Sequence, residues 1–232
     1  MAELRRAYRE DLREISDELL AMGSFVLDML DEVTLALGAM DPERAAEVIA
    51  SDDELDRRYR QVQENLMTTL ALQAPVASDL RRIAASIQVA SHVERMGDLC
   101  VNIARFVHAG DMPVGDESLL AQLEEMSRHA RRLIARALEA FGRADLAQVA
   151  GLPALDDPLD NLNRSVFVTL VRLAATDEAR LEWALRMVLV ARAFERLGDH
   201  AVEIGGHTHY IVTGEIVELT GGEPAAVSRN GR

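Results

Sequence analysis

Hydrophobic residues recur along this chain at steps of three and four, the spacing that places them on one side of an α-helix. The clearest run covers about residues 5–38, where one buried stripe is expected to contain Tyr8, Leu12, Ile15, Leu19, Met22, Val26 and Leu30. Further helices are predicted over residues 53–73, 78–108, 116–142, 157–174 and 177–213. Almost no segment alternates as a strand would, so we expect an all-α protein.

Local signals refine this pattern at two places. Asp41-Pro42-Glu43 supplies an N-cap, a proline at the first helical position and an early acidic residue, which together predict a helix start. The helix that begins there is expected to be short and to end near Ala50. The last residues, 220–232, are polar and rich in glycine, and we expect them to be an unstructured, flexible tail.

The chain also resembles itself. Residues 89–104 (VASHVERMGDLCVNIA) align without gaps with residues 190–205 (VARAFERLGDHAVEIG), with 8 of 16 positions identical. Upstream, DDELD at 52–56 is echoed by DDPLD at 156–160. We interpret the chain as a tandem duplication, with one three-helix repeat in residues 1–110 and a second in 111–219. Short connections between the helices predict two antiparallel three-helix bundles.

Composition narrows the classes of function. Acidic residues outnumber basic ones by 39 to 25 over 232 residues, and no segment forms a basic stripe, so binding to nucleic acid or to an anionic membrane is not expected. A single cysteine, Cys100, rules out an internal disulfide. The charged N-terminus and the lack of any apolar run near 20 residues predict a cytoplasmic protein without direct membrane insertion.

Carboxylates form the most distinctive pattern. In each half, pairs of acidic residues stand four apart, so that each pair lies on one side of a helix. The eight candidate metal ligands are Asp52, Asp56, Glu94 and Asp98 in the first half, and Asp156, Asp160, Glu195 and Asp199 in the second. Helical projection places them away from the main apolar stripe, with Asn102 and Glu203 continuing the same side. If the two helices are antiparallel neighbours, four carboxylates converge on one surface patch.

Two interpretations of these acids remain open. Converging like charges favour a compensating cation, and oxygen ligands suit Mg²⁺, Mn²⁺, Ca²⁺ or carboxylate-bridged iron. Alternatively, the acids form a solvated helix face in which they pair with Arg57, Arg95 or Arg196. Gly97 and Gly198, between the acids, indicate either close helix packing or access to the backbone.

No motif for catalysis is apparent. The sequence has no E-x-x-H and no phosphate-binding, dinucleotide, nucleophile-elbow or zincin signature, so we expect no enzyme activity. His207 and His209 are two residues apart and cannot share a helix face, and we interpret them as ordinary surface or helix-end residues. A carboxylate-bridged metal-dependent enzyme and a metal-free helical scaffold are the alternatives.

The paired ERMGDLCVNIA and ERLGDHAVEIG segments, each after a DDxLD-type block, resemble the PhoU family of phosphate-transport regulators. The opening AYREDLREISDELLAMGSFV and the ending HYIVTGE at 209–215 are similar to that family as well. The resemblance covers roughly residues 5–216.

This resemblance implies two three-helix bundles, each with a surface metal cluster at the eight carboxylates above; the ion could be iron, zinc, manganese or magnesium. It also implies an adaptor that represses phosphate-starvation signalling through contact with the ATPase of the phosphate ABC transporter and with a sensor histidine kinase. We expect phosphate to be sensed by the transporter and the chain to form a homodimer.

The sequence departs from the family pattern at two points. Glu203 stands where the family has asparagine, as at Asn102, so the second site is expected to carry extra negative charge. Pro158 makes Asp157 the expected N-cap of its helix, which leaves Asp156 outside the helix.

Overall fold

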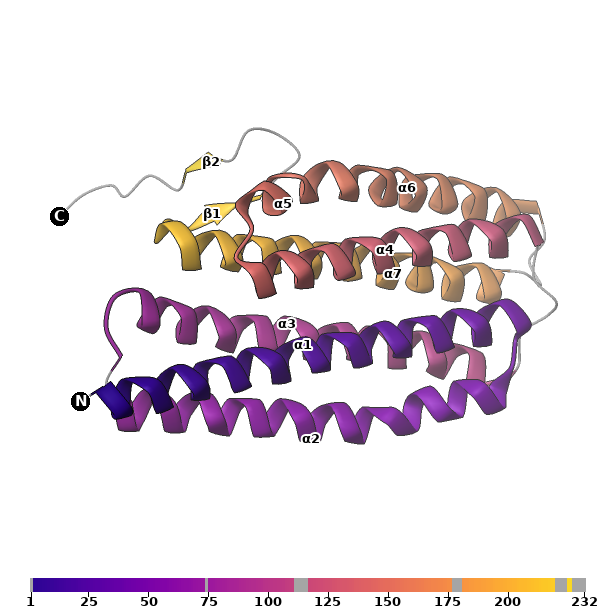
Figure 1. The fold of residues 1–232 in the computed structure, drawn as a ribbon. Coiled ribbons are helices and arrows are strands. Elements are labelled where there is room, and N and C mark those ends of the chain that lie inside the picture. Colours follow the sequence, from indigo (N-terminus) through magenta and orange to yellow (C-terminus); the bar gives the residue numbers. More distant parts are fainter. Residues whose placement is uncertain (1, 74, 111–116, 177–180, 220–224, 227–232) are drawn as a thin grey trace.

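Two three-helix bundles lie side by side along their length (Figure 1). The structure, a computed structural model, describes residues 2–73, 75–110, 117–176, 181–219 and 225–226. The first bundle contains α1 (Ala2–Ala39), α2 (Pro42–Gln73) and α3 (Ser78–His108), and the second contains α4 (Glu117–Arg143), α6 (Leu152–Thr176) and α7 (Leu181–Thr213), with the short α5 (Leu146–Ala150) between α4 and α6. The all-α class and the pair of three-helix bundles predicted from the sequence are confirmed.

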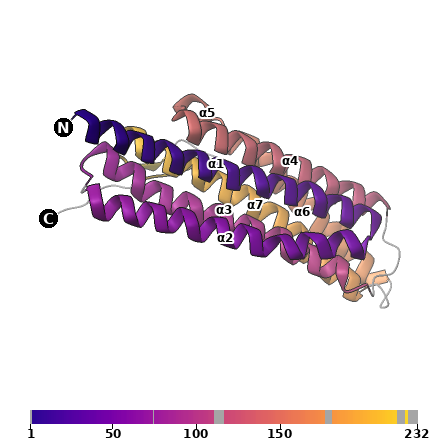
Figure 2. The same cartoon turned by 60° about the horizontal axis from the view of Figure 1, so that its bottom comes forward.

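The two bundles share one hydrophobic core. Helix α3 packs against α7 and α1 against α4, so the equivalent helices of the two repeats meet at the centre of the molecule (Figure 2). Five residues of the buried stripe predicted for the first helix are confirmed, since Ile15, Leu19, Met22, Val26 and Leu30 are all at most 4% exposed. Leu12 is half-buried, and the side chain of Tyr8 lies outside what the structure describes. A continuous core gives the two repeats a fixed relative position.

The same corner ends the first helix of each repeat. Met40 and Ala144 adopt left-handed backbone with φ of 51° and 52°, and each is followed by an aspartate that caps the next helix. Asp41 Oδ1 accepts hydrogen bonds from the backbone of Glu43 and Arg44 at 3.0 and 3.1 Å. Asp145 Oδ1 does the same two and three residues on, at 2.9 and 3.2 Å. The cap predicted at Asp41 is confirmed, and its copy supports the duplication.

The predicted break after Ala50 is wrong. Helix α2 runs without interruption from Pro42 to Gln73, because nothing between Glu43 and Gln73 is glycine or proline. Ser51, just after the predicted end, remains helical, and its hydroxyl donates to the Val48 carbonyl at 2.7 Å. Among the described residues, a separate short helix, α5, occurs in the second repeat alone, and Gly151 follows it as its C-cap.

The predicted start of the sixth helix is also wrong. Helix α6 begins at Leu152 and contains Pro158, so Asp157 is not its N-cap and Asp156 lies inside the helix. Pro153 is the sequence signal for a helix that starts at Leu152, because proline is favoured in the first turn, where a backbone N–H is not needed. Pro158 has no backbone N–H, so the start of α6 lacks one helical hydrogen bond. Burial of Leu152 helps to stabilise this first part of the helix.

The remaining boundaries are close to those expected. Residues 116 and 177–180, assigned above to helices, lie outside the described residues, as do 220–224 and 227–232 of the expected flexible tail. The described tail residues Ala225–Ala226 form β2, which pairs antiparallel with β1 (Val217–Glu218). Among the described residues, no helix has the length and apolar character needed to cross a membrane.

Candidate functional site

The first carboxylate cluster lies between α2 and α3. Asp52 and Asp56 come from α2, and Glu94 and Asp98 come from α3. Burial raises the pKa of Glu94, and the charges of Asp98, Asp56 and Asp52 raise it further. Burial followed by the charge of Asp98 likewise raises the pKa of Asp52. The four acids of α2 and α3 are therefore near enough for their charges to affect one another.

Close contact of the helices at Gly97 produces this convergence. A Cβ atom on Gly97 would lie 2.0 Å from Leu55 Cδ2, and Leu55, between the two aspartates of α2, is 1% exposed. The glycine therefore makes room for a side chain of the neighbouring helix. Of the two interpretations offered for this glycine, the structure supports helix packing.

The second cluster repeats this arrangement between α6 and α7, with Asp156 and Asp160 on α6 and Glu195 and Asp199 on α7. Burial, with the charges of Asp160, Asp199 and Glu195, raises the pKa of Asp156 to about 7. Burial and the charge of Asp199 raise the pKa of Glu195, which is only 8% exposed. The expectation that all these acids lie on the outer side of the helix is wrong for Glu195.

Two oxygens of the second cluster are left without a partner. Within the described part of the chain, Asp156 Oδ1 and Glu195 Oε2 are buried and have no hydrogen-bond partner. A buried, unpaired carboxylate oxygen is costly unless a proton or a cation reaches it. The donor set of the second cluster thus fits a cation with oxygen ligands.

Arginine pairing explains few of the eight acids. Arg57 pairs with Glu54 instead of with an acid of the cluster. Glu195 accepts a hydrogen bond from Arg192 Nη1, and among the described residues it is the one cluster acid with a salt bridge. Salt bridges with arginine therefore do not neutralise most of the acids in the two clusters.

The carboxylate clusters do not have the geometry of a metal site that is ready to bind an ion, in which at least three ligand atoms lie close together. Among the described residues, no three of the eight carboxylates bring ligand atoms within 4.8 Å of one another, whereas His92, Glu203 and His207 do. Each predicted carboxylate site would therefore need side-chain rotation or bridging water to enclose an ion. Metal binding by the eight acids stays a prediction.

The histidine group lies where α3 and α7 pack together. His92 on α3 contacts two residues of α7: its Nδ1 is 3.1 Å from His200 Nδ1, and its Nε2 is 3.3 Å from His207 Nε2. Burial is the main reason that the pKa of His92 and that of His200 fall to about 4, and burial also lowers the pKa of His207. Burial thus favours the neutral form of all three imidazoles, the form that binds a metal ion.

Sequence reasoning missed this group. The interpretation of His207 as an ordinary surface residue is wrong, because its ring is half-buried against His92. A signal was present on α7, where His200, Glu203 and His207 share one helix face at spacings of three and four. The partner His92 could not be found without knowing that α3 packs on α7.

Comparison with known proteins gives the family. A family model described as the PhoU domain matches residues 19–107 and again residues 123–208. The chain belongs to the PhoU family. One matched segment lies in each repeat, and each segment contains all four acids of one carboxylate cluster.

Relatives match over almost their whole length. The phosphate-specific transport system accessory protein PhoU homolog of Clostridium acetobutylicum is 27% identical over 93% of this chain and 98% of its own. The PhoU homolog 1 of Mycobacterium leprae is 31% identical over 93% of this chain and 96% of its own. The crystal structure of the phosphate transport system regulatory protein PhoU from Streptococcus pneumoniae has a TM-score of 0.84 at 25% identity and covers 91% of this chain and all of that one. PhoU from Pseudomonas aeruginosa gives a TM-score of 0.82 at 27% identity, covering 89% of this chain and 99% of that one.

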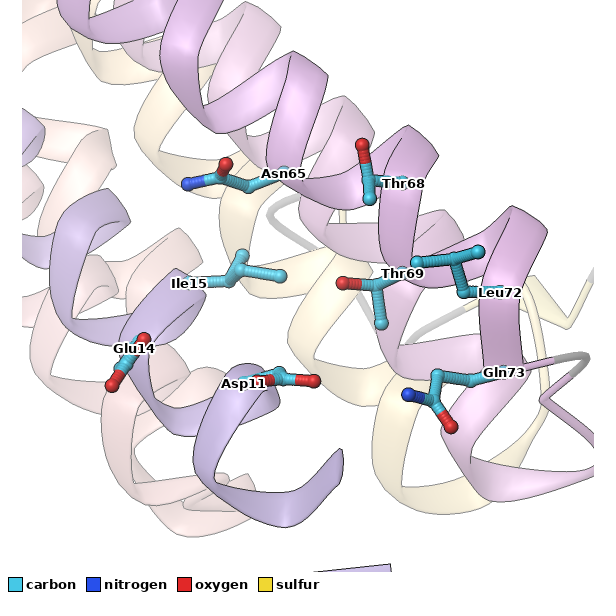
Figure 3. A pocket seen from close by; sticks show the side chains of 8 residues that line it. All are labelled: Asp11, Glu14, Ile15, Asn65, Thr68, Thr69, Leu72 and Gln73. Atoms are coloured by element: carbon cyan, nitrogen blue, oxygen red, sulfur yellow. The ribbon is translucent and has the colours of Figure 1, made fainter. Parts of the chain in front are cut away.

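A surface cavity between α1 and α2 offers no site for phosphate. Figure 3 shows its lining, which consists of Asp11, Glu14, Ile15, Asn65, Thr68, Thr69, Leu72 and Gln73. None of these side chains is basic, and two are acidic. Such a lining repels an anion, so this hollow of the PhoU fold does not suit phosphate.

Proposed function

We propose that this chain is an accessory regulator of phosphate transport, an adaptor that represses the sensor kinase and response regulator of the phosphate-starvation response and modulates the phosphate ABC transporter. The observation that carries the proposal is the match of both repeats to the PhoU domain. Relatives named as phosphate-specific transport system accessory proteins extend over nearly the full chain. Regulation would then work through protein contacts and not through turnover.

Exposed apolar side chains support an adaptor. Six of them lie on the α6–α7 hairpin, each at least 44% exposed: Phe167, Val168, Val171, Leu181, Leu185 and Leu189. Clusters of exposed apolar side chains are typical of protein contact surfaces. We assign this hairpin to contact with a protein of the phosphate transport system.

Charge also favours an adaptor over a phosphate sensor. The net charge of −14 and the acidic cavity between α1 and α2 both disfavour binding of a free anion. Detection of phosphate by the transporter, with this chain relaying the state through contact, is consistent with both features.

The carboxylate clusters are assigned a cation each. Asp52, Asp56, Glu94 and Asp98 would hold one, and Asp156, Asp160, Glu195 and Asp199 the other, in keeping with the raised pKa values of six of these acids. A bound hard divalent ion would neutralise the repulsion within each cluster.

The test is a complementation and pull-down experiment. In cells that lack their own copy, the wild-type chain is expected to restore repression of a phosphate-starvation reporter in high phosphate and to capture the transporter ATPase or the sensor kinase. Leu185→Asp with Leu189→Asp is expected to lose both effects. Leu72→Asp is the matched control, because Leu72 is 75% exposed but lies on α2.

Two outcomes would overturn the proposal. Full repression by the hairpin variant, with its helical content unchanged, would remove the hairpin from the contact surface. Failure of the wild-type chain to capture either partner or to repress the reporter would reject the adaptor itself. A metal-dependent hydrolase or oxidase activity of the purified chain would then become the leading alternative.

A further inference from the structure

A group of four side chains with metal-binding chemistry lies apart from the carboxylate clusters, at the junction of the two repeats. His92 belongs to α3 of the first repeat, and His200, Glu203 and His207 belong to α7 of the second. Ligand atoms of His92, Glu203 and His207 all lie within 4.8 Å of one another. Figures 1 and 2 both show α3 and α7 next to each other at the centre of the molecule.

The spacing of the two outer imidazoles matches a metal site. His92 Nε2 and His207 Nε2 are 3.3 Å apart. A tetrahedral Zn²⁺ with Zn–N distances of about 2.0–2.1 Å separates two ligand nitrogens by about 3.3 Å. Glu203, one helical turn before His207, is exposed and adds a carboxylate while leaving a coordination position open to solvent.

His200 provides a hydrogen-bond acceptor for the ring nitrogen of His92 that would not bind the metal. A metal-bound histidine usually donates its other ring N–H to an acceptor, which fixes the orientation of the ring. His92 Nδ1 is 3.1 Å from His200 Nδ1, so His200 can accept that hydrogen bond while His92 Nε2 faces His207. We treat His200 as a positioning residue and not as a ligand.

Packing alone does not require these residues. The α3 and α7 segments of the two repeats align without gaps, and in that alignment each histidine corresponds to an apolar residue in the other copy: His92 to Ala193, His200 to Leu99 and His207 to Phe106. Glu203 corresponds to Asn102. Helices of the same origin thus pack at this junction with apolar side chains at the equivalent positions. Burying three imidazoles costs desolvation, which the hydrogen bonds of His92 with His200 and His207 offset in part and a bound metal ion would offset further.

We propose that His92, His207 and Glu203 form a Zn²⁺ site that bridges the two repeats, with His200 positioning His92. The nitrogen ligands distinguish it from the carboxylate clusters, since imidazole suits zinc and oxygen-only sets suit Mg²⁺, Mn²⁺ or Ca²⁺. Because the ligands come from both repeats, bound zinc ties α3 to α7. The ion thereby stabilises one relative position of the two bundles.

The experiment uses the untagged full-length chain after removal of metal with a chelator. Zinc affinity is measured by competition with a chromophoric chelator, and Co²⁺ absorption reports the coordination geometry. We expect the wild-type chain to bind Zn²⁺, to show a tetrahedral Co²⁺ spectrum and to gain thermal stability with Zn²⁺ but not with Mg²⁺. His207→Gln and Glu203→Gln should each weaken zinc binding more than about tenfold.

Matched controls separate zinc binding by this group from zinc binding elsewhere on the chain. His209→Gln changes a nearby histidine outside the group and should bind zinc like the wild type. His200→Leu should weaken binding by about 10–100-fold and alter the Co²⁺ spectrum, and His200→Asn, which keeps an acceptor near the Nδ1 position, should restore much of both. Because Glu203 is exposed, Glu203→Gln remains informative if a histidine variant does not fold.

Three results would overturn the proposal. The first is a stripped wild-type chain that takes up no zinc. The second is unchanged zinc affinity in both His207→Gln and Glu203→Gln. The third is loss of zinc only when the carboxylate cluster is changed by Glu195→Gln with Asp199→Asn, which would move the ion to that cluster. None of these results depends on whether the chain regulates phosphate transport.

Discussion

Gly198 lies so close to Asp156 that a Cβ atom on the glycine would be 2.6 Å from Asp156 Oδ1. The glycine thereby lets α6 and α7 approach until a carboxylate is pressed between them. In the first repeat, Gly97 stands in the same place against Leu55. A residue that costs helix stability is therefore used twice to set the distance between the acid-bearing helices.

Replacing Gly97 with alanine should destabilise the protein. The added methyl group would lie 2.0 Å from Leu55 Cδ2 in the core, and overpacking of this kind costs about 1–3 kcal/mol. The better helix propensity of alanine returns up to about 1 kcal/mol. We expect a net loss of about 1–2 kcal/mol in the free energy of unfolding, measured by chemical denaturation.

Gly38→Ala is the matched control for this prediction. Gly38 is also helical, and a Cβ atom there would meet nothing within 4 Å. Its replacement should leave stability unchanged or raise it by up to about 1 kcal/mol. Equal effects of the two substitutions would show that the Gly97 contact does not limit the approach of α2 and α3.

Asp156 should make stability depend on pH in the metal-free protein. Its pKa is raised from the ordinary value of 3.8 to about 7, first by burial and then by the charge of Asp160. Between these two pH values the folded chain holds a proton that the unfolded chain has released. Stability must therefore fall as pH rises from about 4 to about 7.

Asp156→Asn should remove most of that slope. At 1.36 kcal/mol per pKa unit, the change in pKa corresponds to at most about 4 kcal/mol, and partial contact with solvent lowers the expected gain at pH 8 to about 2 kcal/mol. Wild type and variant should have similar stability near pH 4. Denaturation curves at pH 4, 6 and 8 in the presence of a chelator measure this, and parallel pH profiles for the two proteins would contradict it.

The repeat pattern was enough to place the first carboxylate cluster on neighbouring helices, but it left Asp156 outside its helix and Glu195 on the outer side. Asp52 and Glu94 were expected on neighbouring helices because each repeat is local in sequence and its helices are joined by short loops. The boundary of α6 was missed because Pro158 was given more weight than the burial of Leu152. His92 and His207 could not be paired, since the contact of α3 with α7 depends on how the two repeats dock, and no short-range pattern encodes that.

The corner at Ala144 offers a stabilising substitution. Ala144 has φ of 52°, a conformation that costs a residue with a Cβ atom roughly 1–2 kcal/mol. Glycine avoids this cost but loses about 0.5–1 kcal/mol through the greater freedom of the unfolded chain. Ala144→Gly should therefore raise the free energy of unfolding by about 0.5 kcal/mol.

Ala121→Gly tests whether that gain comes from the backbone conformation. Ala121 is an exposed residue inside α4, the helix that ends just before Ala144, and glycine there should cost about 0.5–1 kcal/mol. Opposite signs for the two alanine-to-glycine changes, measured by thermal and chemical unfolding, would support the strained corner. A loss of stability at Ala144 as well would refute it.

Glu94→Gln with Asp98→Asn should separate folding from cation binding in the first carboxylate cluster. The pKa of each acid is raised by burial and then by a neighbouring carboxylate, so removing both charges relieves repulsion in the absence of metal. The metal-free variant should keep its helical content and unfold no more easily than wild type at pH 7.5. Binding of Mn²⁺ to this cluster, followed by the paramagnetic resonance of the free ion, should weaken at least tenfold because a hard cation depends on charged oxygen ligands. Collapse of the helical signal would instead make these acids structural, and unchanged Mn²⁺ binding would place the ion elsewhere.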